Sequence, residues 1–155
     1  YLQNNDLKTA IKHYNMAINL DSLLLPVYSN LASAYSLNGE NEKALKTLNT
    51  YVRFDPASAR PYFLRALIYF EMNQKEKAEN DLIKAMQLDR KDPRIKYNLA
   101  TYYFQEKQYN KAVPVIKEAI NIEPQNPDYK YLLALIYQAQ GKTEAYQLIM
   151  NELNQ

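Results

Sequence analysis

Residues 59–92, ARPYFLRALIYFEMNQKEKAENDLIKAMQLDRKD, form two amphipathic segments joined by a short polar turn, and this pattern recurs along the chain. When the sequence is written in rows of 34 residues, small and aromatic side chains fall into three columns. The columns are Ala32, Ala66, Ala100 and Ala134; Tyr35, Tyr69, Tyr103 and Tyr137; and Ala10, Ala44, Ala78 and Ala112. An internal repeat of this length is typical of an array in which each unit buries its apolar face against its neighbours.

The composition of the 155 residues excludes several classes of protein. With 47% hydrophobic residues the chain is not expected to be disordered, and with 23% charged residues it is expected to be soluble. Membrane insertion is not expected, because no apolar run approaches the length of a membrane span. The net charge of +2 is too small to favour nucleic acid or an anionic membrane as a partner. The absence of cysteine excludes disulfides and thiolate metal sites and leaves the redox compartment open. We expect a soluble protein, cytoplasmic or periplasmic, and the sequence does not decide between these compartments.

The first 24 residues are predicted to be a truncated repeat. Tyr1 falls in the tyrosine column, so only the end of a first helix is represented. Residues 4–6, Asn-Asn-Asp, are predicted to form a turn, and a second helix is predicted over residues 7–20. We therefore expect the chain to be a fragment of a longer array or of a larger protein.

Four further repeats are predicted at residues 25–58, 59–92, 93–126 and 127–155, each a pair of helices within one array. The predicted helices run from Pro26 to the turn at Gly39 and over residues 42–54, 60–72, 75–88, 93–106, 109–122, 127–140 and 143–153. Gly39, Asn73 and Gly141 share the column at the turn inside a pair, where a left-handed backbone conformation is expected. Lys107 holds that column in the fourth repeat and suits it less well.

Two departures from the period predict local irregularity. Pro114 lies inside the second helix of the fourth repeat, where it predicts a bend or a slipped first turn. In the last repeat the spacing between Ala134 and Ala145 is one residue shorter than that between Ala32 and Ala44. Either the final helix is offset by one residue or Tyr146 occupies the alanine column, as in an atypical terminal repeat.

The pattern resembles that of the tetratricopeptide repeat (TPR) family, in which an aromatic, a Leu, a small residue, a Tyr, a turn Gly, two Ala and a Pro stand at fixed offsets. The matching residues are Tyr28, Leu31, Ala32, Tyr35, Gly39, Ala44 and Pro56; Tyr62, Ala66, Tyr69, Ala78 and Ala85; Leu99, Ala100, Tyr103, Ala112, Ala119 and Pro124; and Leu133, Ala134, Tyr137 and Gly141. The departures are Tyr51 for the second Ala, Arg65 for Leu, Arg90 for Pro and Lys96 for the aromatic residue.

The resemblance implies an all-α fold, a right-handed α-solenoid of antiparallel helix pairs with about four full repeats. It also implies that the first helix of each pair lines a concave groove that binds an extended peptide or a partner's helix. Such a protein is a non-enzymatic interaction scaffold without a cofactor. Because fold alone does not determine function, the groove itself must be read from the residues.

The groove residues are predicted from the face of each first helix that packing does not use. They are Asn30, Ser33, Arg60, Phe63, Leu64, Leu67, Phe70, Arg94, Tyr97, Asn98, Thr101, Phe104, Tyr131 and Leu135, with Ser29, Ser36 and Gln138 extending the stripe. Spacings of three and four residues keep each set on one helical face. The aromatic residues predict apolar anchors in the ligand, and the two arginines favour some acidic character.

Two alternatives to foreign-ligand binding are open. In the first, the groove aromatics contact a neighbouring helix of the same array or a flanking domain. In the second, the chain is a structural or oligomerisation segment, whose groove or ends pack on its parent protein or on a second copy. Apolar residues at the two ends favour such self-association, namely Leu7, Ile11, Tyr14, Leu148, Ile149 and Leu153.

Catalysis is not predicted. His13 is the single histidine and is expected to face solvent, and there is no Cys nucleophile, phosphate-binding Gly loop or metal-binding cluster. Asp21, Asp55, Asp89 and Glu123 recur at 34-residue intervals, but their positions between repeats indicate turn formation. Asn30 and Asn98 match one position of the TPR subclass that clamps a C-terminal carboxylate. At Asn30, Ser29 and Ser33 replace the lysine and second asparagine of that clamp, and at Asn98 the preceding helix has Phe63 and Leu67, so the clamp is excluded at both sites.

Overall fold

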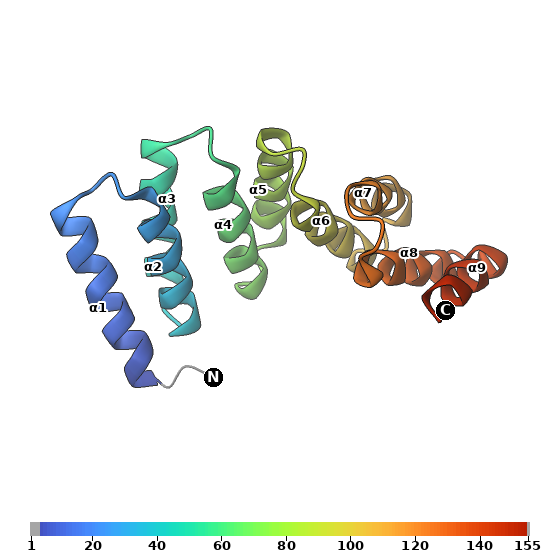
Figure 1. Cartoon of the computed structure of the whole chain (residues 1–155), viewed down its shortest axis with the longest axis horizontal. Coiled ribbons are helices and arrows are strands. Elements are labelled where there is room, and N and C mark those ends of the chain that lie inside the picture. The colour runs from blue at the N-terminus through green and yellow to red at the C-terminus, as the bar shows by residue number, and fades with distance from the viewer. Residues whose placement is uncertain (1–3, 155) are drawn as a thin grey trace. The chain divides into compact units, whose positions relative to one another are not determined.

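The computed structural model describes residues 4–154, and within them every regular element is an α-helix (Figure 1). The helices are α1 (Asn4–Leu20), α2 (Leu25–Leu37), α3 (Asn41–Phe54), α4 (Ala59–Glu71), α5 (Lys75–Leu88), α6 (Pro93–Gln105), α7 (Tyr109–Ile122), α8 (Pro127–Ala139) and α9 (Thr143–Leu153). From α2 onward the observed bounds lie within one or two residues of those predicted. Tyr1, assigned to the tyrosine column, lies outside the described residues.

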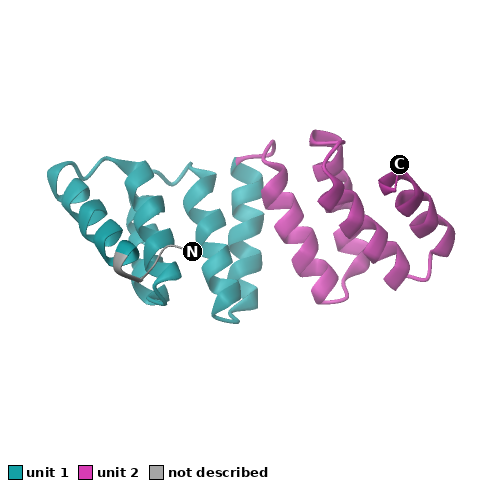
Figure 2. Cartoon of the chain, turned by 60° about the horizontal axis from the view of Figure 1, so that its bottom comes forward, with its two compact units in different colours: residues 1–88 teal, residues 89–155 magenta. Residues whose placement is uncertain are grey.

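The chain divides into two compact units, residues 1–88 and residues 89–155 (Figure 2). In the first unit α2 packs against α3 and α4 against α5, while α1 contacts α2 and α3 contacts α4. In the second unit α6 packs against α7, α8 against α9, and α7 contacts α8. The first helices of successive repeats also touch, α2 with α4 and α6 with α8, so each unit presents a face made of first helices.

The alanine columns allow the two helices of each pair to approach closely. Ala32 and Ala44 are fully buried where α2 meets α3, and Ala66 and Ala78 are fully buried where α4 meets α5. A larger side chain at these positions would force the backbones apart, because protein interiors are already close-packed. The predicted small-residue interface is therefore confirmed.

In all four repeats, the turn inside the pair has a residue with a left-handed backbone conformation at the same position. The φ angles are 79° at Gly39, 56° at Asn73, 56° at Lys107 and 73° at Gly141. The next residue donates its backbone N–H to a carbonyl of the tyrosine column, as in Gln74 to Tyr69 at 2.8 Å. This bond closes the end of the first helix. Lys107 adopts the same conformation as Asn73, although a non-glycine residue there costs about 1–2 kcal/mol.

The acidic residues between repeats form turns, as predicted. Asp21 Oδ1 accepts a hydrogen bond from the backbone N–H of Leu23 at 2.9 Å. Asp89 Oδ1 accepts one from the backbone N–H of Lys91 at 2.9 Å, and Asp55 Oδ1 accepts one from the backbone N–H of Ala57 at 3.1 Å. A side chain that accepts a hydrogen bond from the backbone two residues further on stabilises a turn, and this accounts for the recurrence of these carboxylates between repeats.

The predicted turn at residues 4–6 is wrong, because α1 already begins at Asn4. The residue types that favour turns also favour the start of a helix. Asp6 lies in the first turn of α1, where its charge interacts favourably with the helix dipole. The sequence pattern therefore did not distinguish a turn from a helix N-terminus at this position.

The structure excludes a slipped first turn in α7 and an offset of the final helix, two of the outcomes expected late in the chain. The first turn of α7 is not slipped, because α7 begins at Tyr109 in the column where α5 begins at Lys75, and Pro114 lies within the helix. The final helix is not offset either. Tyr146 donates its backbone N–H to Lys142, as Ala112 does to Gln108, so Tyr146 occupies the alanine column.

One repeat carries an ion pair at two positions that hold uncharged residues in the other repeats. Arg65 stands in the column of Leu31, Leu99 and Leu133, and Asp81 in the column of Thr47, Val115 and Ile149. The guanidinium of Arg65 makes two bonds to the Asp81 carboxylate, at 2.6 and 2.7 Å, and a third to Asn49 Oδ1 at 2.7 Å. The side chains are 17% and 10% exposed. This pair joins α4 to α5 within the interior of the first unit.

Two further charged pairs lie in the second unit, each with a lysine at a position that is aromatic in the first unit. Lys96 and Lys130 stand in the column that holds Tyr28 and Tyr62. Lys96 Nζ lies 3.1 Å from Glu118 Oε2, and Lys130 Nζ lies 3.5 Å from Glu152 Oε2 one repeat later. The Lys96 side chain is only 4% exposed. Lys96 is therefore one partner of an ion pair that recurs at the same positions of the next repeat, and it is not an isolated substitution.

Candidate functional site

A hollow lies on the first-helix face of the first unit, between α2 and α4. Its volume is about 210 Å³. The residues that line it are Ser33, Ser36 and Leu37 of α2 and Leu64, Leu67, Ile68 and Glu71 of α4. Each set follows the three- and four-residue spacing of one helical face, so regular helix geometry alone brings these side chains to one surface.

The floor of this hollow is continuous with the core. Ile68 is 5% exposed and belongs to a buried cluster with Ala32, Ala44 and Leu48, and Leu64 packs against that cluster. Leu67 is half-buried, whereas Leu37 is 70% exposed. The apolar surface of the hollow is therefore held in place from below by close packing and remains accessible from above.

The electrostatics of the hollow are simple. Helix α2 contains no charged residue. Arg65 of α4 bonds to Asp81 and is not among the residues that line the hollow. Among the seven described residues that line the hollow, Glu71 alone carries a charge. The Ser36 hydroxyl lies 3.0 Å from both Glu71 Oε2 and Asn41 Oδ1, and its single proton serves one of these two acceptors at a time. The contact with Glu71 links the two walls of the hollow at its rim.

The hollow brings together only some of the predicted groove residues of the first unit. Ser33, Leu64 and Leu67 line it, whereas Asn30 and Arg60 are exposed elsewhere and the partly buried Phe63 and Phe70 are not among its lining residues. The sequence prediction missed Leu37, Ile68 and Glu71. Glu71 follows Leu64 by seven residues and Leu67 by four, so the same helical periodicity that selected the leucines would have found it.

The serine stripe predicted for the second repeat needs a correction at Ser29. Ser29 is fully buried, and its hydroxyl has no hydrogen-bond partner among the described residues. It therefore contributes to packing of α2 and not to an accessible surface, while Ser33 is exposed and Ser36 is half-buried. Small size allowed the helix at Ser29 to be covered, which a stripe read from spacing alone does not reveal.

The predicted groove residues of the second unit are largely occupied within that unit. The rings of Tyr97 and Tyr129 lie 5.3 Å apart, and those of Phe104 and Tyr109 lie 6.0 Å apart. Asn98 donates to the backbone oxygen of Arg94, and Thr101 to that of Tyr97, both at 2.8 Å. Tyr131 is 49% exposed and Leu135 is half-buried. Of the aromatic residues in this set, Tyr131 of α8 is therefore the exposed one.

Arg94 is already paired. Asp92 is the N-cap of α6, and its carboxylate accepts a hydrogen bond from the backbone N–H of Arg94 at 2.9 Å and from the guanidinium at 2.6 and 3.0 Å. This contact with Arg94 holds the pKa of Asp92 below its ordinary value. An acidic ligand group would have to compete with Asp92 for this arginine, whereas Arg60 is exposed.

Replacing Asp92 with alanine is expected to lower the free energy of unfolding by about 1 kcal/mol, because α6 loses its cap. Asp92→Asn keeps the cap and removes the charge, so it isolates the pairing with Arg94. Because the folded pKa is lowered, the ionic contribution is complete above about pH 4 and is lost as the pH falls through the folded pKa. Urea unfolding at neutral and acidic pH measures this. A wild-type advantage over Asp92→Asn that persists at pH 2 would contradict the assignment.

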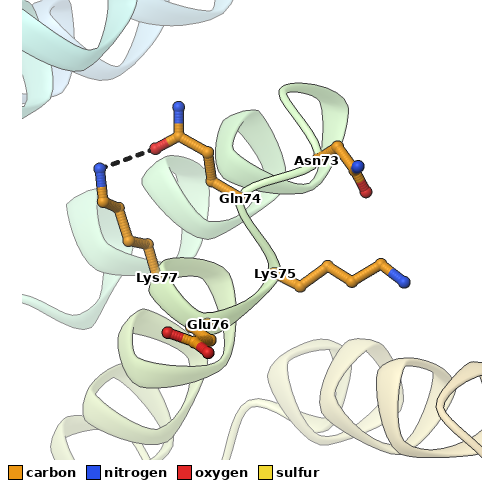
Figure 3. Close-up of a pocket in the computed structure, with 5 residues that line it drawn as sticks. All are labelled: Asn73, Gln74, Lys75, Glu76 and Lys77. Carbon is orange, nitrogen blue, oxygen red and sulfur yellow. Dashed lines mark hydrogen bonds between the residues drawn. The ribbon is translucent and has the colours of Figure 1, made fainter.

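A larger hollow lies at the turn between α4 and α5, with a volume of about 490 Å³. Its lining is the consecutive run from Asn73 to Lys77. Figure 3 shows Lys77 directed toward Gln74, whose Oε1 accepts a hydrogen bond from Lys77 Nζ at 2.8 Å, while Asn73 and Lys75 extend away from this pair. A lining of polar turn residues without an apolar floor makes this hollow a weaker candidate than the one between α2 and α4.

Sequence comparison places the chain in a known family. Two models, both described as Tetratricopeptide repeat, match it, one at residues 69–136 and 103–147 and the other at residues 25–58. The first alone spans more than half of the chain. The chain belongs to the tetratricopeptide repeat family. Tetratricopeptide repeats are in general scaffolds for protein–protein interaction, and none of the curated proteins matches this chain in sequence.

Solved structures of tetratricopeptide repeat proteins share the fold. The crystal structure of MamA has a TM-score of 0.84 at 21% identity, covering 96% of this chain and 87% of MamA. A tetratricopeptide repeat protein from Parabacteroides merdae has a TM-score of 0.82 at 18% identity, covering 96% of this chain and 59% of its own. YrrB, described as a TPR protein with an unusual peptide-binding site, has a TM-score of 0.75 at 17% identity, covering 96% and 77%.

Two further features bear on the range of functions. Within the described residues, no group of three or more His, Cys, Asp or Glu side chains is placed to hold a metal ion. No helix among those residues has the combination of length and apolar character that a membrane span needs. His13 is exposed on α1, as predicted.

Proposed function

We propose that this tetratricopeptide repeat chain is a non-enzymatic scaffold that binds a peptide or a partner's helix through its first-helix face, with the hollow between α2 and α4 as the anchor point. An apolar side chain of the ligand enters the hollow. The exposed Arg60, on the same helix as Leu64 and Leu67, suits an acidic residue elsewhere in the ligand. The coexistence of a packed floor and an accessible apolar wall in this hollow carries the proposal.

The size of the hollow supports a side chain as its occupant. Sites for drug-sized ligands and cofactors usually measure about 300–1,000 Å³, so a hollow of about 210 Å³ is too small for most of them. Burying one aliphatic or aromatic side chain contributes about 1.5–3 kcal/mol. Anchors of this kind dominate the energetics of many interfaces, because water is excluded from a well-packed pocket.

A second candidate function is self-association through the ends of the chain. In α1 and the segment after it, Met16, Leu20 and Leu23 are 51%, 88% and 66% exposed. Leu7 of α1 is buried and does not contribute to this surface. In the C-terminal helix α9, Leu148 is 64% exposed. Clustered apolar exposure of this kind marks interaction surfaces, so a second copy or another part of a parent protein is the occupant that this candidate requires.

The test is to select 12-residue peptides from a displayed random library on the immobilised chain and to measure their binding by fluorescence polarisation. Leu67→Ala is expected to weaken the selected peptides about tenfold, because the anchor loses part of its contact surface. Leu148→Ala is the matched control, an exposed leucine outside the hollow, and is expected to leave binding unchanged. Circular dichroism checks that both variants remain folded.

The two candidates differ in their response to these variants. Peptide binding that Leu67→Ala leaves intact contradicts the hollow as the anchor point. Sedimentation velocity of the chain at increasing concentration tests the alternative. Self-association that Leu148→Ala abolishes and Leu67→Ala does not would favour the second candidate function.

A further inference from the structure

Glu71 sets the charge of the hollow between α2 and α4. It is the last residue of α4, its side chain is exposed, and the Ser36 hydroxyl holds Oε2 at 3.0 Å. This contact places the carboxylate at the rim of the hollow, which Leu67 and Leu37 also line. An exposed carboxylate next to apolar surface is a favourable contact for a cation on a ligand.

The two helix ends add to this negative potential. Ser36, Leu37 and Glu71 belong to the last turns of α2 and α4, where the helix dipole places partial negative charge. Neither last turn contains a basic residue, although Lys, Arg and His are the residues that usually compensate this charge. The hollow thus lies beside the last turns of α2 and α4, and Glu71 adds a carboxylate to the second of them.

The cations of α4 do not neutralise this region. Arg65 is bonded to both oxygens of Asp81 on the side of α4 that faces α5. Arg60 lies eleven residues before Glu71, which corresponds to about 16 Å along the helix axis. That distance exceeds the Debye length of about 8 Å at physiological ionic strength, so Arg60 has little effect at the exposed Glu71.

We infer that the hollow selects a ligand segment in which an apolar side chain is adjacent to a lysine or arginine, the apolar group entering between Leu64 and Leu67 and the cation meeting Glu71. This inference rests on the proposed peptide-binding function and assigns its specificity. It is compatible with an acidic ligand residue at Arg60, because the two charges lie at opposite ends of α4. The ligand is therefore bipolar along this helix.

The experiment uses a defined panel of fluorescein-labelled 12-residue peptides with a central Leu, Phe or Met flanked by Lys, Gln or Glu. Wild type is expected to bind the Lys-flanked peptides about fivefold more tightly than the Gln-flanked ones at low salt, and the Glu-flanked ones most weakly. Glu71→Gln is expected to remove this order, and Glu71→Lys to reverse it. High salt is expected to reduce the preference of wild type. Glu42→Gln, an exposed carboxylate of α3 in the same unit, is the control and keeps the preference of wild type.

Leu67→Ala separates failure of this inference from failure of the proposed function. If the panel binds, Leu67→Ala weakens every member and the charge order is insensitive to Glu71→Gln, the function stands and the inference is overturned. If no member of the panel gives saturable binding that depends on Leu67, both are overturned. If Glu42→Gln changes the order as much as Glu71→Gln does, the preference reflects general surface charge and the inference is likewise overturned.

Discussion

Replacing Asp81 with alanine is expected to lower the free energy of unfolding by about 3 kcal/mol, a large effect for a charged residue in this chain. Without Asp81 the guanidinium of Arg65, whose side chain is only 17% exposed, keeps its bond to Asn49 but has no countercharge. A charge left unpaired in a mostly buried position pays its desolvation without compensation. Urea unfolding followed by circular dichroism measures the loss.

A double substitution distinguishes loss of the ion pair from loss of packing. Arg65→Leu with Asp81→Val introduces the residue types that stand at the same two positions one repeat later, Leu99 and Val115, so the double variant is expected to be within about 1 kcal/mol of wild type. Asn80→Ala, at the exposed neighbour of Asp81, is the control and is expected to change stability by less than about 0.5 kcal/mol. A double variant as unstable as Asp81→Ala would show that the ion pair itself supplies stability that apolar packing cannot.

Replacing Leu82 with alanine is expected to cost about 3 kcal/mol as well, for a different reason. Leu82 is fully buried in the column of Leu48 and Ile116, so truncation leaves a cavity that close-packed neighbours cannot fill. Met150 stands in the same column on α9, where it is only half-buried. Met150→Ala is therefore expected to cost less than half as much.

The comparison between Leu82→Ala and Met150→Ala measures how evenly stability is distributed along the array. No residue of α9 is buried among those the structure describes, so local opening of that helix is expected to require less free energy than opening of α5. Amide hydrogen exchange provides a second readout. Equal costs for the two substitutions, or equal protection of α5 and α9, would contradict this interpretation.

The sequence predicted most of the fold because its strongest signals are local. The 34-residue columns, the turn residues Gly39 and Asn73, and the aspartates between repeats each report on a few neighbouring residues, and all were confirmed. The failure at residues 4–6 has a physical cause. Asn and Asp favour both turns and helix N-termini, so their identity does not decide between the two.

The candidate site was predicted less completely, because it depends on what side chains touch. Periodicity identified Ser33, Leu64 and Leu67 as members of one face, but it did not show that Ser29 would be covered. It also did not show that Arg94 would be bound by Asp92. Asp92 precedes α6, so a search of the faces of that helix does not include it. Partner choice among charged groups depends on rotamers and on neighbouring elements, and residue spacing carries little of that information.

The charged pairs inside the repeats have a consequence for how such a chain grows. Arg65 and Asp81 are 16 residues apart, and Lys96 and Glu118 are 22 apart, so each pair fits within one period. A tandem duplication whose boundaries enclose both residues copies the two partners together, and the recurrence of Lys96 and Glu118 as Lys130 and Glu152 has the form that such an event leaves. The new repeat then receives a lysine together with the glutamate that pairs with it.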